Sequence, residues 1–201
     1  DPNANPLREL GALRNRQVWL TLLTGAVGFG GFFAVYTYIA STVQTTLGGS
    51  ETSVAIMLMV AGAGMTVFNL VMGALADRNI NLTGYLAFGI GTLVLLAYPT
   101  AVAGGLWTMG LAVALMAILG GVSTVMQTRL MNIAGDAQQL AASLHHAAFN
   151  IANALGPFLA ARVVAGGYGF PSSGYVGAVL SAAGFLLFAL TLWDARRSGI
   201  E

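Results

Sequence analysis

One stretch of fifty consecutive residues carries no charged side chain: 79-NINLTGYLAFGIGTLVLLAYPTAVAGGLWTMGLAVALMAILGGVSTVMQT-128. A helix that spans a lipid bilayer needs about 20 largely apolar residues. The stretch is therefore long enough for two spanning helices, with a turn near Pro99–Gly105. Its apolar residues would lie on every side of either helix, which is typical of a helix surrounded by lipid and other helices. The pattern predicts spanning helices over 82–100 and 106–129.

Four further charge-free runs each have room for one span: 17–50, 52–76, 137–161 and 163–193. The sequence therefore predicts an all-α, polytopic membrane protein with six transmembrane helices. The expected spans are 17–43, 53–76, 82–100, 106–129, 141–165 and 174–194. We expect residues 17–194 to form one transmembrane domain, with a cytoplasmic linker over 1–16 and a cytoplasmic tail over 195–201.

The composition excludes several classes of protein. Hydrophobic residues make up 57% of the chain and charged residues 7%, against about 25% charged residues in an ordinary globular domain. A water-soluble fold cannot cover its surface with so few charges, and a disordered chain would be far less apolar. The absence of cysteine excludes a disulfide scaffold. The net charge of +1 does not indicate the basic surface that binds nucleic acid. No cofactor is expected, because the glycine clusters lie within the expected spans and follow no strand.

The arginines indicate how the helices cross the membrane. With six spans, both termini and the second and fourth loops lie on one side, which carries seven of the eight basic residues. Cytoplasmic loops are enriched in arginine, so both termini are expected in the cytoplasm. Trp19, Trp107 and Trp193 lie at ends of expected spans, as interfacial tryptophans do. Residues Asp1–Arg16 are polar and lack the pattern of a signal peptide, so we interpret them as a linker that precedes a domain.

Glycine is frequent, with 27 residues, and clusters occur at Gly25–Gly31 and next to proline at Gly156–Pro157. Small residues let helices approach closely in lipid, where the hydrophobic effect does not drive their association. Alternatively, these positions bend helices that rock during transport, as a proline within a span does. Composition leaves both interpretations open.

The helix expected at 141–165 concentrates the polar residues. His146, Asn150 and Asn153 follow one another at i, i+4 and i+7 and share one face. Such a strip lines a water-filled cavity or forms hydrogen bonds between helices, and both interpretations remain open for the two asparagines. For His145 and His146, near the membrane interface, we favour a structural role. No metal site is expected, because neither cysteine nor a nearby carboxylate accompanies them.

Other residues are expected to face the same cavity. Asn69 and Gln127 carry amides within spans, and Phe33 and Tyr36 belong to an aromatic cluster that suits a moderately hydrophobic ligand. No nucleophile or acid–base pair can be assembled at helix depth, so the sequence does not indicate an enzyme. The candidate substrate-binding residues are Phe33, Tyr36, Asn69, Gln127, His146, Asn150 and Asn153.

Short motifs resemble a known family. Gly73-Ala-Leu-Ala-Asp77-Arg78 is similar to the Gly-x-Leu-Ala-Asp-Arg signature of the major facilitator superfamily, and Asn153-Ala-Leu-Gly156-Pro157 to its Gly-Pro antiporter motif. From Gln127 to Gly156 the chain resembles bacterial carriers of the arabinose efflux permease type, among the twelve-span drug:proton antiporters. The resemblance departs after Arg78, where Asn79-Ile-Asn81-Leu-Thr replaces the basic residues of the signature.

This resemblance implies that the chain is the C-terminal half of a secondary carrier, with six helices in a 3+3 inverted repeat, in the bacterial inner membrane. It implies a small-molecule substrate, proton coupling through acids of the first half, and an N-terminal six-helix partner in the same polypeptide or a separate chain. Asp77 would cap a neighbouring helix, and Arg78 would belong to a cytoplasmic charge cluster that holds the outward-open state. The implied conformational residues are Gly73, Asp77, Arg78, Arg129, Gly156 and Pro157.

Two alternatives to this half-carrier are an autonomous six-span transporter that acts as a homodimer and a non-transporting membrane assembly domain. In an assembly domain, alanine at Asn150 and Asn153 reduces stability without altering ligand binding. In a transporter, the same changes abolish binding or transport and leave the fold intact.

Overall fold

The computed structural model describes residues 10–135 and 137–199, and every regular element within them is helical. In these residues, five helical segments are long and apolar enough to cross a membrane. They are Arg16–Thr46, Glu51–Ala103, Leu106–Ala134, Gln138–Tyr168 and Phe170–Arg197.

Most of these segments change helix type along their length. The first follows the 3-10 helix η1 (Leu10–Arg14) and consists of α2 (Arg16–Gly28), α3 (Gly30–Tyr36), α4 (Ile39–Ser41) and the π-helix η2 (Thr42–Thr46). The third consists of α6 (Leu106–Met116), the 3-10 helix η3 (Ala117–Leu119) and α7 (Gly120–Ala134). The fourth is α8 (Gln138–Val163) with the π-helix η4 (Val164–Tyr168), and the last is the 3-10 helix η5 (Phe170–Ser172) with α9 (Ser173–Arg197).

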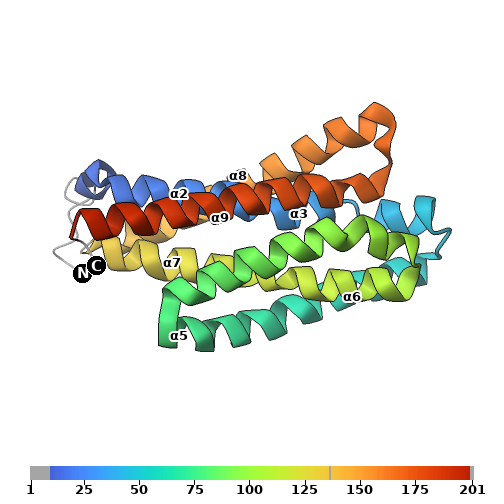
Figure 1. Ribbon diagram of the computed structural model, residues 1–201, viewed down its shortest axis with the longest axis horizontal. Helices are drawn as coiled ribbons and strands as arrows, with labels where there is room; N and C mark the ends of the chain where they lie inside the picture. The colour runs from blue at the N-terminus through green and yellow to red at the C-terminus, as the bar shows by residue number, and fades with distance from the viewer. Residues whose placement is uncertain (1–9, 136, 200–201) are drawn as a thin grey trace.

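The second segment, α5 (Glu51–Ala103), doubles back on itself. Its 53 residues would measure about 80 Å as a straight helix, against a hydrocarbon core of about 30 Å. Asn79 has non-helical dihedral angles (φ −157°, ψ 94°), and the arms 51–78 and 80–103 run in opposite directions (Figure 1). The Asn79 Oδ1 accepts a hydrogen bond from the Leu82 backbone N–H at 2.9 Å. Asn79 therefore ends the first arm and caps the second.

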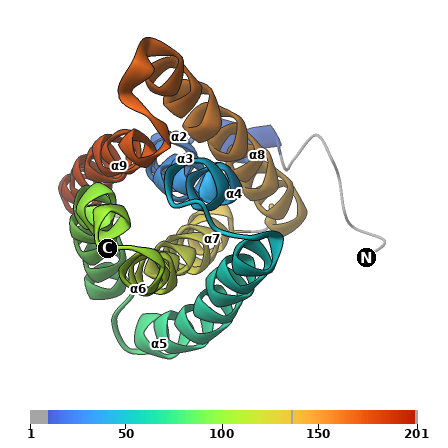
Figure 2. The same cartoon turned by 90° about the vertical axis from the view of Figure 1, so that its right-hand side faces the viewer.

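The helices lie along one axis, with the start of α2 and the end of α9 at the same end of the bundle (Figure 1). In the end-on view, α3 lies between α8 and α9 (Figure 2), and it contacts both. The second arm of α5 packs on α9, where the Phe88 and Phe188 ring centroids are 6.0 Å apart. The first arm packs on α6 and α7, with Gly64 against Ala114 and Met72 against Gly121. The segment α2–α3 packs on α7, α8 and α9, and we call it the central segment.

Pairs of glycines bring this central segment into backbone contact with α8 and α9. A Cβ atom built on Gly31 would lie 2.5 Å from the Gly177 carbonyl oxygen, and one built on Gly177 would lie 2.6 Å from the Gly31 carbonyl oxygen. Two further glycines are as tightly packed: a Cβ atom built on Gly184 of α9 would overlap the Gly28 backbone, and one built on Gly156 of α8 would overlap the Gly30 carbonyl oxygen. Contacts this short leave no room for a side chain, so these glycines serve close helix packing.

The substitution Gly31→Ala is expected to destabilise the protein by about 1–3 kcal/mol, the usual cost of forcing an extra methyl group into a packed interior. The measurement is the unfolding midpoint of the full-length gene product in detergent. Gly110→Ala is the matched control, because its added methyl would lie 3.8 Å from the flexible Met57 side chain and alanine favours a helix. Equal midpoints for the two variants would contradict tight packing at Gly31.

Candidate functional site

Helix α8 separates its residues onto two faces. Its buried residues recur every three or four positions and, apart from one histidine, are small: Ala141, His145, Ala148, Ala152, Gly156 and Ala160. This buried face packs on α2 and α3. His146, Asn150 and Asn153 lie on another face, and all three side chains are exposed. We call these three residues the outer polar strip, because they point out of the bundle.

Two amide candidates come from α7, which contacts α8, and from α5, which contacts α7. Gln127 is half-buried on α7, and Asn69 is exposed on the first arm of α5. The Asn69 Oδ1 lies beside Gly120 of α7, 2.9 Å from where a Cβ atom of that glycine would be. In the end-on view, α8 and the first arm of α5 flank α7 and α3 (Figure 2). The two amides and the outer polar strip therefore belong to neighbouring helices.

The two aromatic candidates on α3 have different surroundings. The Phe33 ring is half-buried and packs edge-on against Phe29 and Phe149, with centroids 5.1 and 6.1 Å away. Tyr36 stacks on Phe32 at 5.3 Å and keeps 37% of its surface exposed. Phe33 thus holds α3 against α8, and Tyr36 is the one of the two with an aromatic face open to a ligand.

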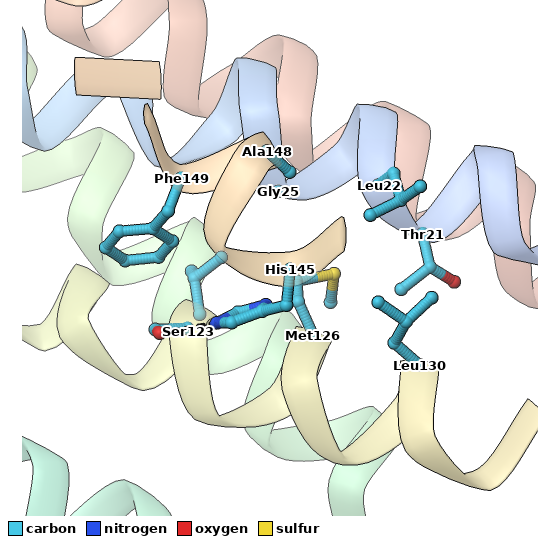
Figure 3. Close-up of a pocket in the computed structure, with 10 residues that line it drawn as sticks. Thr21, Leu22, Gly25, Ser123, Met126, Leu130, His145, Ala148 and Phe149 are labelled. Atoms are coloured by element: carbon cyan, nitrogen blue, oxygen red, sulfur yellow. Dashed lines mark hydrogen bonds between the residues drawn. The ribbon is translucent and has the colours of Figure 1, made fainter. Parts of the chain in front are cut away.

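A small cavity lies inside the bundle between α2, α7 and α8 (Figure 3). Of the two histidines, His145 lines it: its Nε2 lies 3.3 Å from Ser123 Oγ on α7, and its ring centroid lies 5.4 Å from that of Phe149. The rest of the lining is apolar apart from Thr21. The described residues contain no group of three metal-ligating side chains. The Ser123–His145 contact therefore joins two helices, in keeping with a structural role for this histidine.

The motif Gly73–Arg78 forms the end of the first arm of α5. Gly73 is half-buried, whereas Asp77 and Arg78 are exposed beside the break at Asn79. In the part of the chain that the structure describes, neither charged side chain has a hydrogen bond or ion pair. The helix cap beside them is Asn79 rather than Asp77. The second conformational pair lies on α8, where Gly156 contacts α3 and the helix continues through Pro157.

A buried polar cluster joins three helices at the end of the bundle where α2 begins. Gln17 is 1% exposed, and its Nε2 donates hydrogen bonds to Asp194 Oδ2 at 2.7 Å and to the Thr191 carbonyl oxygen at 3.2 Å. Its Oε1 accepts a hydrogen bond from the Arg129 guanidinium at 3.2 Å. The other Asp194 oxygen lies 3.2 Å from the Arg16 guanidinium. We call these five residues the Gln17 cluster, which ties α2 to α7 and α9.

Of this cluster, the sequence pointed only to Arg129, through the family resemblance. A glutamine in the first turn of an apolar helix is a signal that a polar partner is needed. The partner itself does not follow from spacing, because Gln17 and Asp194 are 177 positions apart in the chain.

Comparison with known proteins decides the family. Residues 20–199 match the model of the Major Facilitator Superfamily. The chain belongs to this superfamily. It is 32% identical over 187 residues to the inner membrane transport protein YdhP of Escherichia coli K12. It is 34% identical over 166 residues to a chloramphenicol resistance protein of Streptomyces lividans, and 26% identical over 175 residues to the putative transporter AraJ of E. coli K12.

These alignments cover most of the chain but only part of each relative. They include 90%, 79% and 85% of the chain, against 46%, 41% and 44% of the three relatives. The chain thus spans about half the length of the curated relatives it matches. Membership in the superfamily confirms the resemblance carried by Gly73–Arg78. It identifies a multi-pass membrane protein of a transporter family rather than an enzyme.

The substitution Gln17→Leu is expected to lower the free energy of unfolding by about 1–3 kcal/mol, because it removes a buried partner from both Asp194 and Arg129. The readout is the thermal midpoint of the full-length gene product in detergent. Gln44→Leu on η2 is the control, since the Gln44 side chain is exposed. If Gln17→Leu melts no earlier than this control, the Gln17 cluster does not stabilise the bundle.

Proposed function

We propose that this chain forms the C-terminal, six-span half of a twelve-span carrier in the bacterial inner membrane. In this proposal the carrier exports small hydrophobic drug-like or sugar-like molecules in exchange for protons. The observation that carries the proposal is the outer polar strip of α8. Strongly polar side chains are costly against lipid, so this strip needs water or a second protein surface opposite it. The alignment with only 46% of YdhP supports a partner of similar size.

Six spans result when each arm of α5 is counted as one. The reversal at Asn79 supports this count, because one hydrocarbon core cannot contain a helix of 53 residues. The start of α2 and the end of α9 lie at one end of the bundle, as an even number of crossings requires (Figure 1). That end carries exposed arginines, which favours a cytoplasmic location for both. In this proposal the segment α2–α4 and the two arms of α5 form the first repeat of the 3+3 inverted repeat, and α6–α7, α8 and α9 form the second.

The substrate pathway in this proposal lies between the two halves. The outer polar strip, together with Asn69 and Gln127, supplies amide and imidazole groups that bind polar atoms of a substrate. Tyr36 supplies an aromatic face that stacks on Phe32, and Phe33 packs edge-on against the same Phe32 ring. Such a surface suits a molecule with an apolar body and a few polar groups. One relative is named for chloramphenicol resistance, which makes chloramphenicol a suitable first probe.

Proton coupling would rely on an acid of the other half. Among the described residues, Glu51, Asp77 and Asp194 lie near the ends of helices or helix arms, and no carboxylate lies at the middle of one. Asp77 and Arg78 are exposed, which suits contacts with the N-terminal half in the outward-open state. The remaining conformational residues of the proposal are Gly73, Arg129, Gly156 and Pro157.

The substitutions Asn150→Ala and Asn153→Ala in the full-length gene product are expected to reduce export about tenfold each, the effect of one lost hydrogen bond of about 1.4 kcal/mol. Export is measured as the accumulation of radiolabelled chloramphenicol and arabinose in cells, with and without a protonophore. The unfolding midpoints should stay at the wild-type value, because both side chains are exposed.

The matched control is Ser143→Ala on the same helix, because the Ser143 Oγ bonds only to the Gln139 carbonyl oxygen of its own helix, at 2.9 Å. This variant should export normally. Lower midpoints with unchanged export for the asparagine variants would instead indicate a membrane assembly domain. Export that persists with the protonophore would exclude proton coupling.

The size of the native gene product tests the half-carrier directly. An antibody against the peptide 194–201 is applied to a blot of host membranes. A band near twice 20.7 kDa is expected for a full carrier in one polypeptide. A band at 20.7 kDa would contradict that arrangement and leave a homodimer or a separately encoded partner, which cross-linking distinguishes.

A further inference from the structure

The exposed faces of α2 and α9 end in the same residue types. Each face runs from leucine to tryptophan to arginine toward one end of the bundle, at spacings of three or four residues, so each set shares one helix face. The residues are Leu23, Trp19 and Arg16 on α2, and Leu190, Trp193 and Arg197 on α9. The start of α2 and the end of α9 are neighbours (Figure 1), so the two tryptophan–arginine pairs lie at one end of the bundle.

One ion pair joins the two helices of this group, and two further contacts fix individual side chains. The Arg16 guanidinium lies 3.2 Å from Asp194 Oδ1 and so reaches across from α2 to α9. The Arg197 guanidinium carbon lies 4.3 Å from the Trp193 ring centroid. The Trp19 Nε1–H donates a hydrogen bond to the Leu13 carbonyl oxygen at 2.7 Å, which holds η1 and its exposed Arg14 against α2. We call Arg14, Arg16, Trp19, Trp193 and Arg197 the α2/α9 arginine patch.

The charge of this patch is not balanced within the part of the chain that the structure describes. Asp194 is 8% exposed, and its two oxygens already contact Gln17 and Arg16. At the opposite end of the bundle, Arg162 is also exposed, but it is a single arginine and lies over the Phe158 ring at 5.4 Å. The α2/α9 end is therefore the end of the bundle that attracts an anion more strongly.

The length of α9 gives the depth of the patch in the membrane. Tyr175 and Trp193 are both exposed and 18 residues apart, which is about 27 Å along a helix and close to the hydrocarbon thickness of about 30 Å. Tyrosine and tryptophan favour the two headgroup regions. Arg197, one turn beyond Trp193, then lies at the level of lipid phosphates, and Leu190 lies beside the acyl chains.

From this arrangement we propose that the α2/α9 arginine patch binds an anionic phospholipid of the cytoplasmic leaflet. Arg14, Arg16 and Arg197 surround the phosphate with guanidinium donors, which pair well with phosphate oxygens. The two indoles flank the glycerol region, and the acyl chains lie along Leu23 and Leu190. A lipid held in this way bridges the first and last described helices at their shared end.

The test places the full-length gene product in nanodiscs of phosphatidylcholine with increasing phosphatidylglycerol, and follows the thermal midpoint. The apparent affinity for phosphatidylglycerol is expected to fall about 25-fold in Arg14→Gln/Arg197→Gln, about fivefold for each arginine. This double variant leaves the Arg16–Asp194 ion pair intact. Its midpoint in pure phosphatidylcholine reports whether it still folds.

Two further variants make the result specific. The double variant Arg14→Lys/Arg197→Lys retains the charge and should keep most of the stabilisation by phosphatidylglycerol. It tests the proposal even if the glutamine double variant fails to fold. Arg162→Gln at the opposite end should respond as the wild type does. The proposal is overturned if the Lys and Gln double variants respond alike, if Arg162→Gln loses the response equally, or if inorganic phosphate stabilises the protein as well as the lipid does.

Discussion

Backbone contact between glycines is the constraint on which the rest of the bundle depends. Lipid does not drive helices together as water does, so their association relies on close packing and on hydrogen bonds. Gly31 against Gly177 and Gly30 against Gly156 fix the rotation of the central segment relative to α9 and α8. Because Gly156 packs against α3, the face of α8 that carries His145 points into the bundle and the outer polar strip points out of it. The packing of one residue without a side chain thus decides which polar groups of α8 lie on the outside of the bundle.

Much of the helical architecture follows from the sequence alone. Long charge-free runs predict membrane helices because nothing else accommodates them, and the structure has long apolar helices over the same stretches. The reversal between 76 and 82 was expected from the polar Asp77–Asn81 segment. The sequence does not predict how the chain reverses. Asn79 is a single non-helical residue, and the residues on both sides of it are helical. Spacing locates such a joint only to within a few residues, because side-chain capping decides the residue at which a helix ends.

Helical periodicity made part of the candidate site predictable. The 3.6-residue period places His146, Asn150 and Asn153 on one face, and the structure agrees. Periodicity does not say which of two adjacent histidines points inward, since that depends on where α8 meets its neighbours. The contact between Gln17 and Asp194 is even harder to predict from the sequence. Gln17 signals that it needs a polar partner but does not identify it, and only the antiparallel contact of α2 with α9 brings the two side chains to 2.7 Å.

The central position of α2–α3 has a consequence for biosynthesis. This segment is made before α8 and α9, yet its glycine contacts and the hydrogen bonds that Gln17 Nε2 donates are with those later helices. During translation it therefore lies in the membrane before the helices that pack on it and the acceptors of the Gln17 amide have been synthesised. The bundle can close only after α9 has been inserted, so this domain completes its fold with the last of its described helices. A ribosome that stops before α9 leaves a chain in which α2 displays an unsatisfied glutamine amide, a feature by which membrane quality control can recognise it.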